Sequence, residues 1–132
     1  MEHPSGRSYY AFRQGRVCFL ALDTGNDCAD DEAGLFRNAD MIAEERRWLR
    51  RTVGSEMFRT AEFRVAFLHM PPYNNRHGSK AGLALIDGMF DRHPLHLMVS
   101  WHVHRYFRID AFSGVCTSPH PSPTMQNTPV LP

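Results

Sequence analysis

Two histidines separated by one residue, His102 and His104, follow an apolar stretch that begins at Leu97. In an extended backbone successive side chains point to opposite faces, so these two imidazoles project from the same side, with their Cα atoms about 7 Å apart. Two imidazoles on one side of a strand end are a natural half of a metal site. The chain holds eight histidines in 132 residues, so one such pair arises easily by chance and needs further support.

A third histidine, His69, follows another apolar run, Phe63 to Leu68. The next residues include Pro71 and Pro72, which cannot continue a strand ladder because proline has no backbone N–H. Where strands alternate with helices, reactive groups collect at the carboxyl ends of the strands. The sequence therefore predicts that three imidazoles, those of His69, His102 and His104, converge at one edge of a sheet.

The elements that must position these histidines are an N-terminal hairpin followed by alternating helices and strands. We expect hairpin strands at 8–12 and 16–22 around an Arg13-Gln14-Gly15 loop, helices at about 39–53 and 80–90, and strands at 63–68 and 95–100. This alternation predicts an α/β fold with a mostly parallel sheet. Residues 17–22 are apolar without alternation, which is typical of a strand covered on both faces.

The first helical stretch carries both an apolar stripe and a cluster of charge. The predicted stripe consists of Met41, Ile42, Trp48, Leu49 and Val53, and the side chains expected mostly outside it are Glu44, Glu45, Arg46, Arg47, Arg50 and Arg51. The four arginines could form a phosphate or nucleic-acid patch. Because the two glutamates partly neutralise them, a solvated helix face is the favoured interpretation.

Composition limits the class of protein without naming a partner. The apolar fraction of 42%, the charged fraction of 22% and the net charge of +1 are ordinary for a globular domain and give no long-range attraction to nucleic acid or anionic membrane. Three cysteines without C-x-x-C spacing favour neither a disulfide scaffold nor a zinc knuckle. No signal peptide or membrane span is evident, so we expect a soluble chain of unknown compartment. Residues 113–132 are rich in proline and are expected to form a poorly ordered tail.

Several segments together resemble the calcineurin-like metallophosphoesterases, and among them the purple-acid-phosphatase-like bacterial hydrolases. The matching segments are Tyr9-Tyr10-Ala11-Phe12, Val17-Cys18-Phe19-Leu20-Ala21-Leu22-Asp23-Thr24, the 45–49 helix with Trp48-Leu49, Phe67-Leu68-His69-Met70-Pro71-Pro72-Tyr73, and Trp101-His102-Val103-His104-Arg105-Tyr106-Phe107-Arg108. The resemblance covers roughly residues 8 to 110. It implies that residues 1–112 are the C-terminal part of a metallophosphoesterase domain, a partial α/β/β/α sandwich.

The resemblance also implies a two-metal site of the iron, zinc or manganese type. His104 would bind the first metal ion, and His69 and His102 would bind the second. Two such ions would clamp a phosphate ester and lower the pKa of a bridging water. The side chains that would line the substrate are Tyr73, His77, Tyr106 and Arg108.

The chain departs from the family pattern in two ways. The Asp-x-His, Gly-Asp and Gly-Asn-His motifs of the family would lie before Tyr9, where this sequence has only eight residues, and Trp101 replaces the usual glycine. We therefore expect a fragment that binds at most one metal ion weakly, hydrolyses little or no phosphate ester by itself, and pairs with a missing N-terminal half. A non-catalytic remnant or interaction module is the alternative, and neither nucleic acid nor membrane is an expected partner.

Overall fold

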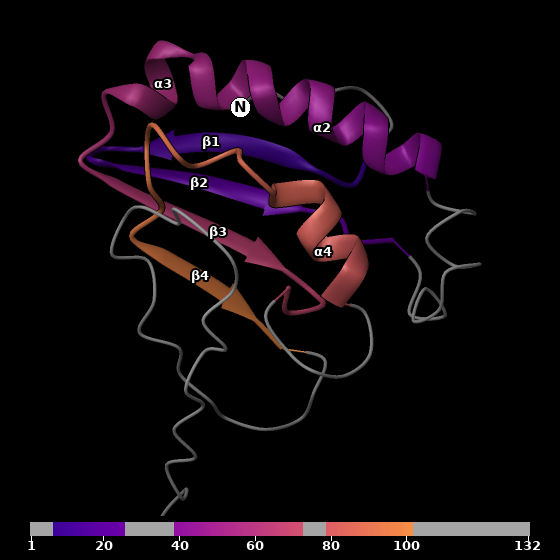
Figure 1. The fold of residues 1–132 in the computed structure, drawn as a ribbon. Coiled ribbons are helices and arrows are strands. Elements are labelled where there is room, and N and C mark those ends of the chain that lie inside the picture. The colour runs from indigo at the N-terminus through magenta and orange to yellow at the C-terminus, as the bar shows by residue number, and fades with distance from the viewer. Residues whose placement is uncertain (1–6, 26–38, 73–78, 102–132) are drawn as a thin grey trace, which may run out of the picture.

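The computed structural model describes residues 7–25, 39–72 and 79–101, and these form an α/β fold built on one four-stranded sheet (Figure 1). The strands lie in the order β1-β2-β3-β4. In chain order the elements are β1 (Tyr10–Gln14), β2 (Val17–Leu22), α2 (Ala39–Gly54), α3 (Glu56–Arg59), β3 (Phe63–Leu68), α4 (Ser79–Ile86) and β4 (Leu97–Ser100). None of the helices in these three ranges is long and apolar enough to cross a membrane.

The sheet is mixed, with one antiparallel pair and two parallel pairs. β1 and β2 form the predicted hairpin, but β1 is shifted two residues toward the C-terminus relative to the expected 8–12 run. The ladder extends to the pair Gln14↔Val17, so Arg13 and Gln14 belong to the strand and not to the loop. Gly15 adopts the left-handed conformation that the tight turn requires, with φ of +58°. β2 pairs in parallel with β3, and β3 in parallel with β4, so each return of the chain needs a helical crossover.

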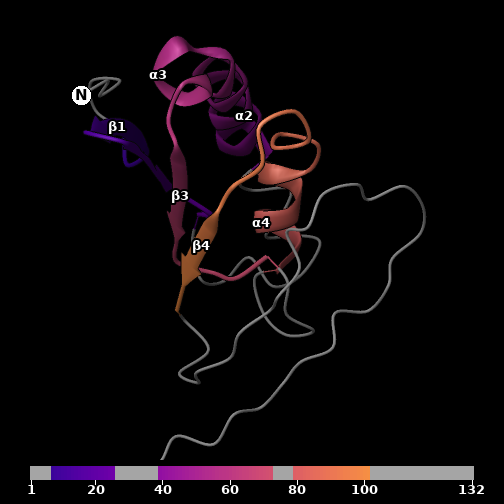
Figure 2. The ribbon, with the colours of Figure 1, turned by 90° about the vertical axis from the view of Figure 1, so that its left-hand side faces the viewer.

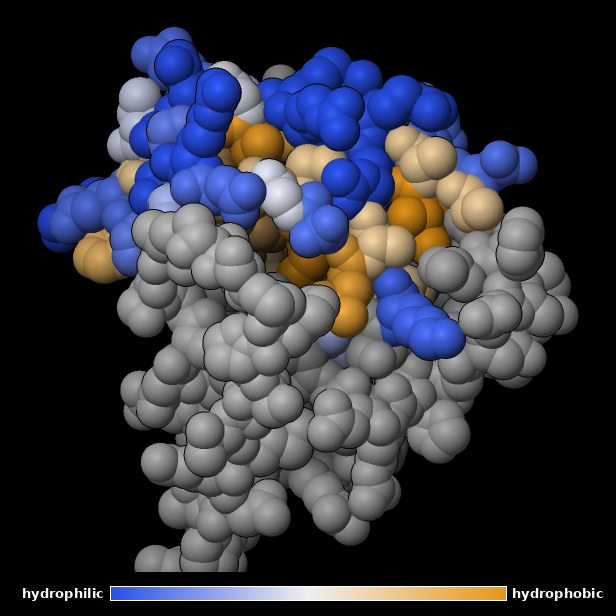
Figure 3. Space-filling model, viewed as in Figure 1, coloured by the Kyte–Doolittle hydropathy of each residue, from blue (hydrophilic) through white to orange (hydrophobic). Residues whose placement is uncertain are grey.

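The helices lie together on one side of the sheet, as the edge-on view of Figure 2 shows. The sheet residues facing them are almost completely buried and consist of Ala11, Cys18, Leu20, Leu22, Ala66 and Leu68. α2 covers them with Ile42, Trp48 and Leu49, and α4 packs beside α2. The outer surface of α2, at the top of Figure 3, is mainly hydrophilic, as an amphipathic helix requires.

The opposite face of the sheet carries a row of aromatic rings. Tyr10 stacks on Phe12, Phe12 on Phe19 and Phe19 on Phe67, with ring centroids 6.2, 4.9 and 6.1 Å apart. All four rings are half-buried. No element of the described ranges covers this face, so the predicted second layer stays a prediction.

Two further element boundaries differ from the sequence-based expectation, and one short helix is additional. The second long helix ends at Ile86 rather than near residue 90, because Gly88 has a φ of +69°, which leaves the helical conformation. The short helix α3, capped by the Ser55 side chain, was not predicted. β4 begins at Leu97 rather than residue 95, and the predicted tail at 113–132 lies outside the described residues.

Leu49 is the clearest test of the core, since its side chain is 0% exposed between α2 and the sheet. We predict that Leu49→Ala lowers the free energy of unfolding by about 2 to 5 kcal/mol, because it removes buried apolar contacts and leaves a cavity. Urea denaturation followed by circular dichroism measures the change. Leu83→Ala, at a position that is 38% exposed, is the matched control and should cost less than about 1 kcal/mol. Equal losses in the two variants would contradict this packing.

Candidate functional site

The carboxyl ends of β2, β3 and β4 meet at one edge of the sheet because these strands are parallel. The last paired residues are Leu22, Leu68 and Ser100, and the next side chains along the edge are therefore Asp23, His69 and Trp101. The Trp101 N–H donates a hydrogen bond to the His69 carbonyl, with an N–O distance of 3.2 Å. The chain that leaves β4 thus starts directly beside His69.

The imidazole of His69 is half-buried at this edge and contacts the Trp101 indole. The two rings meet edge to face, with centroids 6.3 Å apart and planes 80° apart. Trp101 is 54% exposed, so the indole lies partly in solvent. The Trp101 indole therefore fits at the surface, where it contacts His69. His69 is the one predicted metal ligand within the described residues.

The other predicted site residues lie outside the described ranges. They are the metal ligands His102 and His104 and the substrate-lining candidates Tyr73, His77, Tyr106 and Arg108. Within the described parts of the chain, no three His, Cys, Asp or Glu side chains are arranged to hold a metal ion. The convergence of three imidazoles remains a prediction.

Asp23 is the carboxylate nearest to the end of β2, and its oxygens are already engaged. They accept hydrogen bonds from the Ser8 hydroxyl and from the Gly25 N–H, the latter at 2.8 Å. The second bond forms a local turn of the kind that Asp stabilises after a strand. Asp23 therefore has a structural role in ending β2.

A second carboxyl group, that of Glu45, is fully buried beneath this edge, although the helical pattern placed it among the outer side chains. Its Oε1 accepts a hydrogen bond from the Asp23 N–H at 2.9 Å. Its Oε2, like the Oγ1 of the buried Thr24, has no hydrogen-bond partner among the described residues. The helical spacing could have predicted this burial. Glu45 lies three residues after Ile42 and four before Leu49, so it falls on the buried stripe of α2.

Burial raises the pKa of the Glu45 carboxyl to about 8, because a low-dielectric surrounding disfavours the charged form. The hydrogen bond from the Asp23 backbone opposes this increase, and the nearby Asp23 carboxylate adds to it. Below that pH the folded protein holds Glu45 mainly as the neutral acid. A neutral carboxyl group is a poor metal ligand, so Glu45 does not supply the carboxylate that the edge lacks.

The four arginines of α2 do not form the uniform solvated face that their pattern favoured. Arg46 crosses to α4 and donates hydrogen bonds to the carbonyls of Ala84, Leu85 and Asp87, at 2.6, 3.1 and 3.1 Å. These carbonyls belong to the C-terminal end of α4, where unpaired acceptors favour a cation. Arg46 therefore ties the two helices together, whereas Arg47, Arg50 and Arg51 are exposed, as the favoured interpretation expected.

Searches of protein-family models, curated protein sequences and solved structures find no match to this chain.

Glu45 gives the fold a specific dependence on pH. Its carboxyl group keeps a proton in the folded state up to about pH 8, whereas in the unfolded chain it loses the proton near its usual pKa of 4.5. The buried neutral carboxyl therefore stabilises the fold fully below the unfolded pKa of 4.5. This part of the free energy of unfolding is lost as the pH rises to the folded pKa of about 8. We predict that Glu45→Gln becomes progressively more stable than the wild type between pH 5 and 8, by up to about 1.4 kcal/mol per pH unit.

Urea denaturation of both proteins across this pH range measures the difference, which isolates Glu45 from the titrating histidines. The matched control is Glu44→Gln at the neighbouring position, where the Arg7 side chain lowers the pKa of the carboxyl. Its stability relative to the wild type should not increase over the same range. A pH-independent difference for Glu45→Gln would contradict the buried neutral acid.

Proposed function

We propose that this chain carries the late histidine ligands of a metal-dependent phosphoester hydrolase of the calcineurin-like type. The observation that carries the proposal is the position of His69 at the end of β3, hydrogen-bonded through its backbone to the first residue after β4. His102 and His104 follow Trp101 immediately in the sequence. The segment that contains them therefore starts at Trp101, whose indole contacts the His69 imidazole.

The donor set fits one metal ion better than two. Three neutral imidazoles suit a zinc-like ion, and such an ion would lower the pKa of a bound water and polarise a phosphoryl oxygen. No carboxylate of the described edge is assigned as a bridge to a second ion, because Asp23 does not form a group with two further metal-binding side chains and Glu45 is buried as an acid. In this proposal the remaining ligands and the proton donor belong to a preceding part of the domain, and the substrate is a phosphate ester.

Metal binding by the full chain tests the proposal most directly. We predict that the metal-stripped protein binds one equivalent of Co²⁺ or Zn²⁺, and that the triple variant His69→Ala/His102→Ala/His104→Ala binds it at least tenfold more weakly. Cobalt absorption bands and calorimetric titration with zinc provide the readout.

The matched control replaces three histidines that are not among the proposed ligands, His3, His93 and His120, by alanine. This control should retain the parent affinity, because it lacks the same number of imidazoles but none of the proposed ligands. Equal losses in the two triple variants would refute the assignment of ligands.

The same assignment predicts very low hydrolytic activity. With three imidazoles as ligands and, among the described residues, no group assigned as bridging carboxylate or as acid for the leaving group, the purified 132-residue chain should hydrolyse an aryl phosphate at close to the background rate, with or without zinc. Release of the phenolate from 4-nitrophenyl phosphate measures the rate. Substantial metal-dependent turnover would overturn the proposal of an incomplete site.

A non-catalytic interaction module is the second candidate, and the contact between Trp101 and His69 favours it. An exposed indole packed on the edge of the predicted ligand occupies space beside that imidazole. If the parent protein binds no metal ion at all, this second candidate replaces the first.

A further inference from the structure

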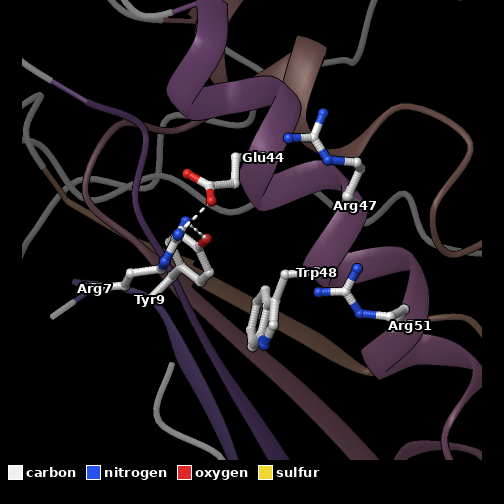
Figure 4. Close-up of a pocket in the computed structure, with 6 residues that line it drawn as sticks. All are labelled: Arg7, Tyr9, Glu44, Arg47, Trp48 and Arg51. Atoms are coloured by element: carbon white, nitrogen blue, oxygen red, sulfur yellow. Dashed lines mark hydrogen bonds and ion pairs between the residues drawn. The ribbon is translucent and has the colours of Figure 1, made fainter. Parts of the chain in front are cut away.

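A pocket of about 320 Å³ lies beside β1, at the opposite edge of the sheet from β4. Its walls come from two parts of the chain, the segment before β1 and the part of α2 from Glu44 to Arg51. The lining residues, drawn in Figure 4, are Arg7, Tyr9, Glu44, Arg47, Trp48 and Arg51. We call it the arginine pocket. None of the proposed metal ligands lines it.

One wall of the arginine pocket is fixed by packing. Trp48 and Tyr9 are 6% and 3% exposed, and their rings contact each other with centroids 4.8 Å apart. Arg7 is held at Tyr9 by an ion pair with Glu44, by a 2.8 Å hydrogen bond to the Tyr9 hydroxyl, and by a cation–π contact 5.9 Å from the Tyr9 ring. The two rings therefore have a fixed position in this wall, and Arg7 is bound to it from the surface.

The charges of the pocket do not cancel. Three arginines and one carboxylate, Glu44, line the pocket, so its lining keeps two net positive charges. Glu44 pairs with Arg7, and the nearby Arg47 also helps to lower the pKa of that carboxyl. Arg47 and Arg51 are four positions apart on α2, so their side chains leave the helix on the same face, with Cβ atoms about 6 Å apart. Neither makes an ion pair with a carboxylate within the described ranges.

Two guanidinium groups on one helix face match a phosphate group in charge. Guanidinium forms bidentate hydrogen bonds with phosphate oxygens, and a phosphate monoester carries about −1.5 to −2 charges at pH 7. The pocket volume is at the lower end of the usual range for small-molecule sites, about 300 to 1,000 Å³. A pocket of this size fits a single small molecule better than the extended backbone of a nucleic acid.

We propose that the arginine pocket binds a small phosphate monoester, with the phosphate between the exposed Arg47 and Arg51 side chains and next to the buried Trp48 ring. This site is separate from the proposed metal centre and does not rest on it. Binding here requires neither His69 nor a metal ion.

Trp48 provides the readout. The chain has two tryptophans, so in a Trp101→Phe background the emission comes from the pocket residue alone. Titration of the full chain, free of metal, with phenyl phosphate should change this emission saturably, and the phenyl phosphate should remain intact. The variant Arg47→Gln/Arg51→Gln should bind at least tenfold more weakly, and phenol should produce no saturable change.

The matched control is Arg50→Gln/Arg59→Gln, which removes the same number of charges from exposed positions outside the pocket. It should bind phenyl phosphate within twofold of the parent. Arg47→Lys/Arg51→Lys keeps the charge but removes the bidentate geometry. Its affinity for phenyl phosphate should lie between the affinities of the two glutamine double variants.

Three results would overturn the proposal. They are the absence of a saturable change in the parent, equal losses in the two glutamine variants, and phenol binding as tightly as phenyl phosphate. Circular dichroism of each variant establishes that the fold is retained. Because no metal ion is present, a negative result here leaves the proposed metal centre untouched, and the reverse also holds.

Discussion

The parallel pairing of β2 with β3, which extends from Val17↔Phe63 to Leu22↔Leu68, determines most of this structure. Two parallel neighbours cannot be joined by a tight turn, so the chain must cross over through α2 and α3. The crossover places α2 against the buried side of the sheet, where α4 joins it after β3. It also brings the ends of the parallel strands to one edge, where His69 lies beside the start of the segment that contains the other candidate ligands.

The polar side chains of α2 show how one helix serves several purposes. Glu45 faces inward and accepts a hydrogen bond from the end of β2, whereas Arg46 satisfies the last carbonyls of α4. Arg47 and Arg51 border the pocket beside β1. A uniformly solvated face would leave the end of α4 without these hydrogen bonds, so part of the charge on α2 is structural.

The two faces of the sheet differ in what the described residues place on them. Aliphatic side chains such as Leu20 and Leu68 are buried beneath the helices, whereas the aromatic row from Tyr10 to Phe67 lies on the other face and is half-buried. Stacked rings bury part of their surface against one another, so the row gains contact area from its own neighbours. The apolar character of β2 reflects both environments.

The sequence by itself determined the α/β class, the bounds of the 63–68 strand and the 39–54 helix, and the position of His69 after its strand, because periodicity and prolines act over a few residues. It placed Glu45 and Arg46 in the wrong surroundings. Glu45 interacts with Asp23, 22 residues away, and Arg46 with Ala84, 38 residues away. Only the packing of α2 against the sheet and α4 decided the burial of that carboxyl, since contacts between distant segments leave no local pattern.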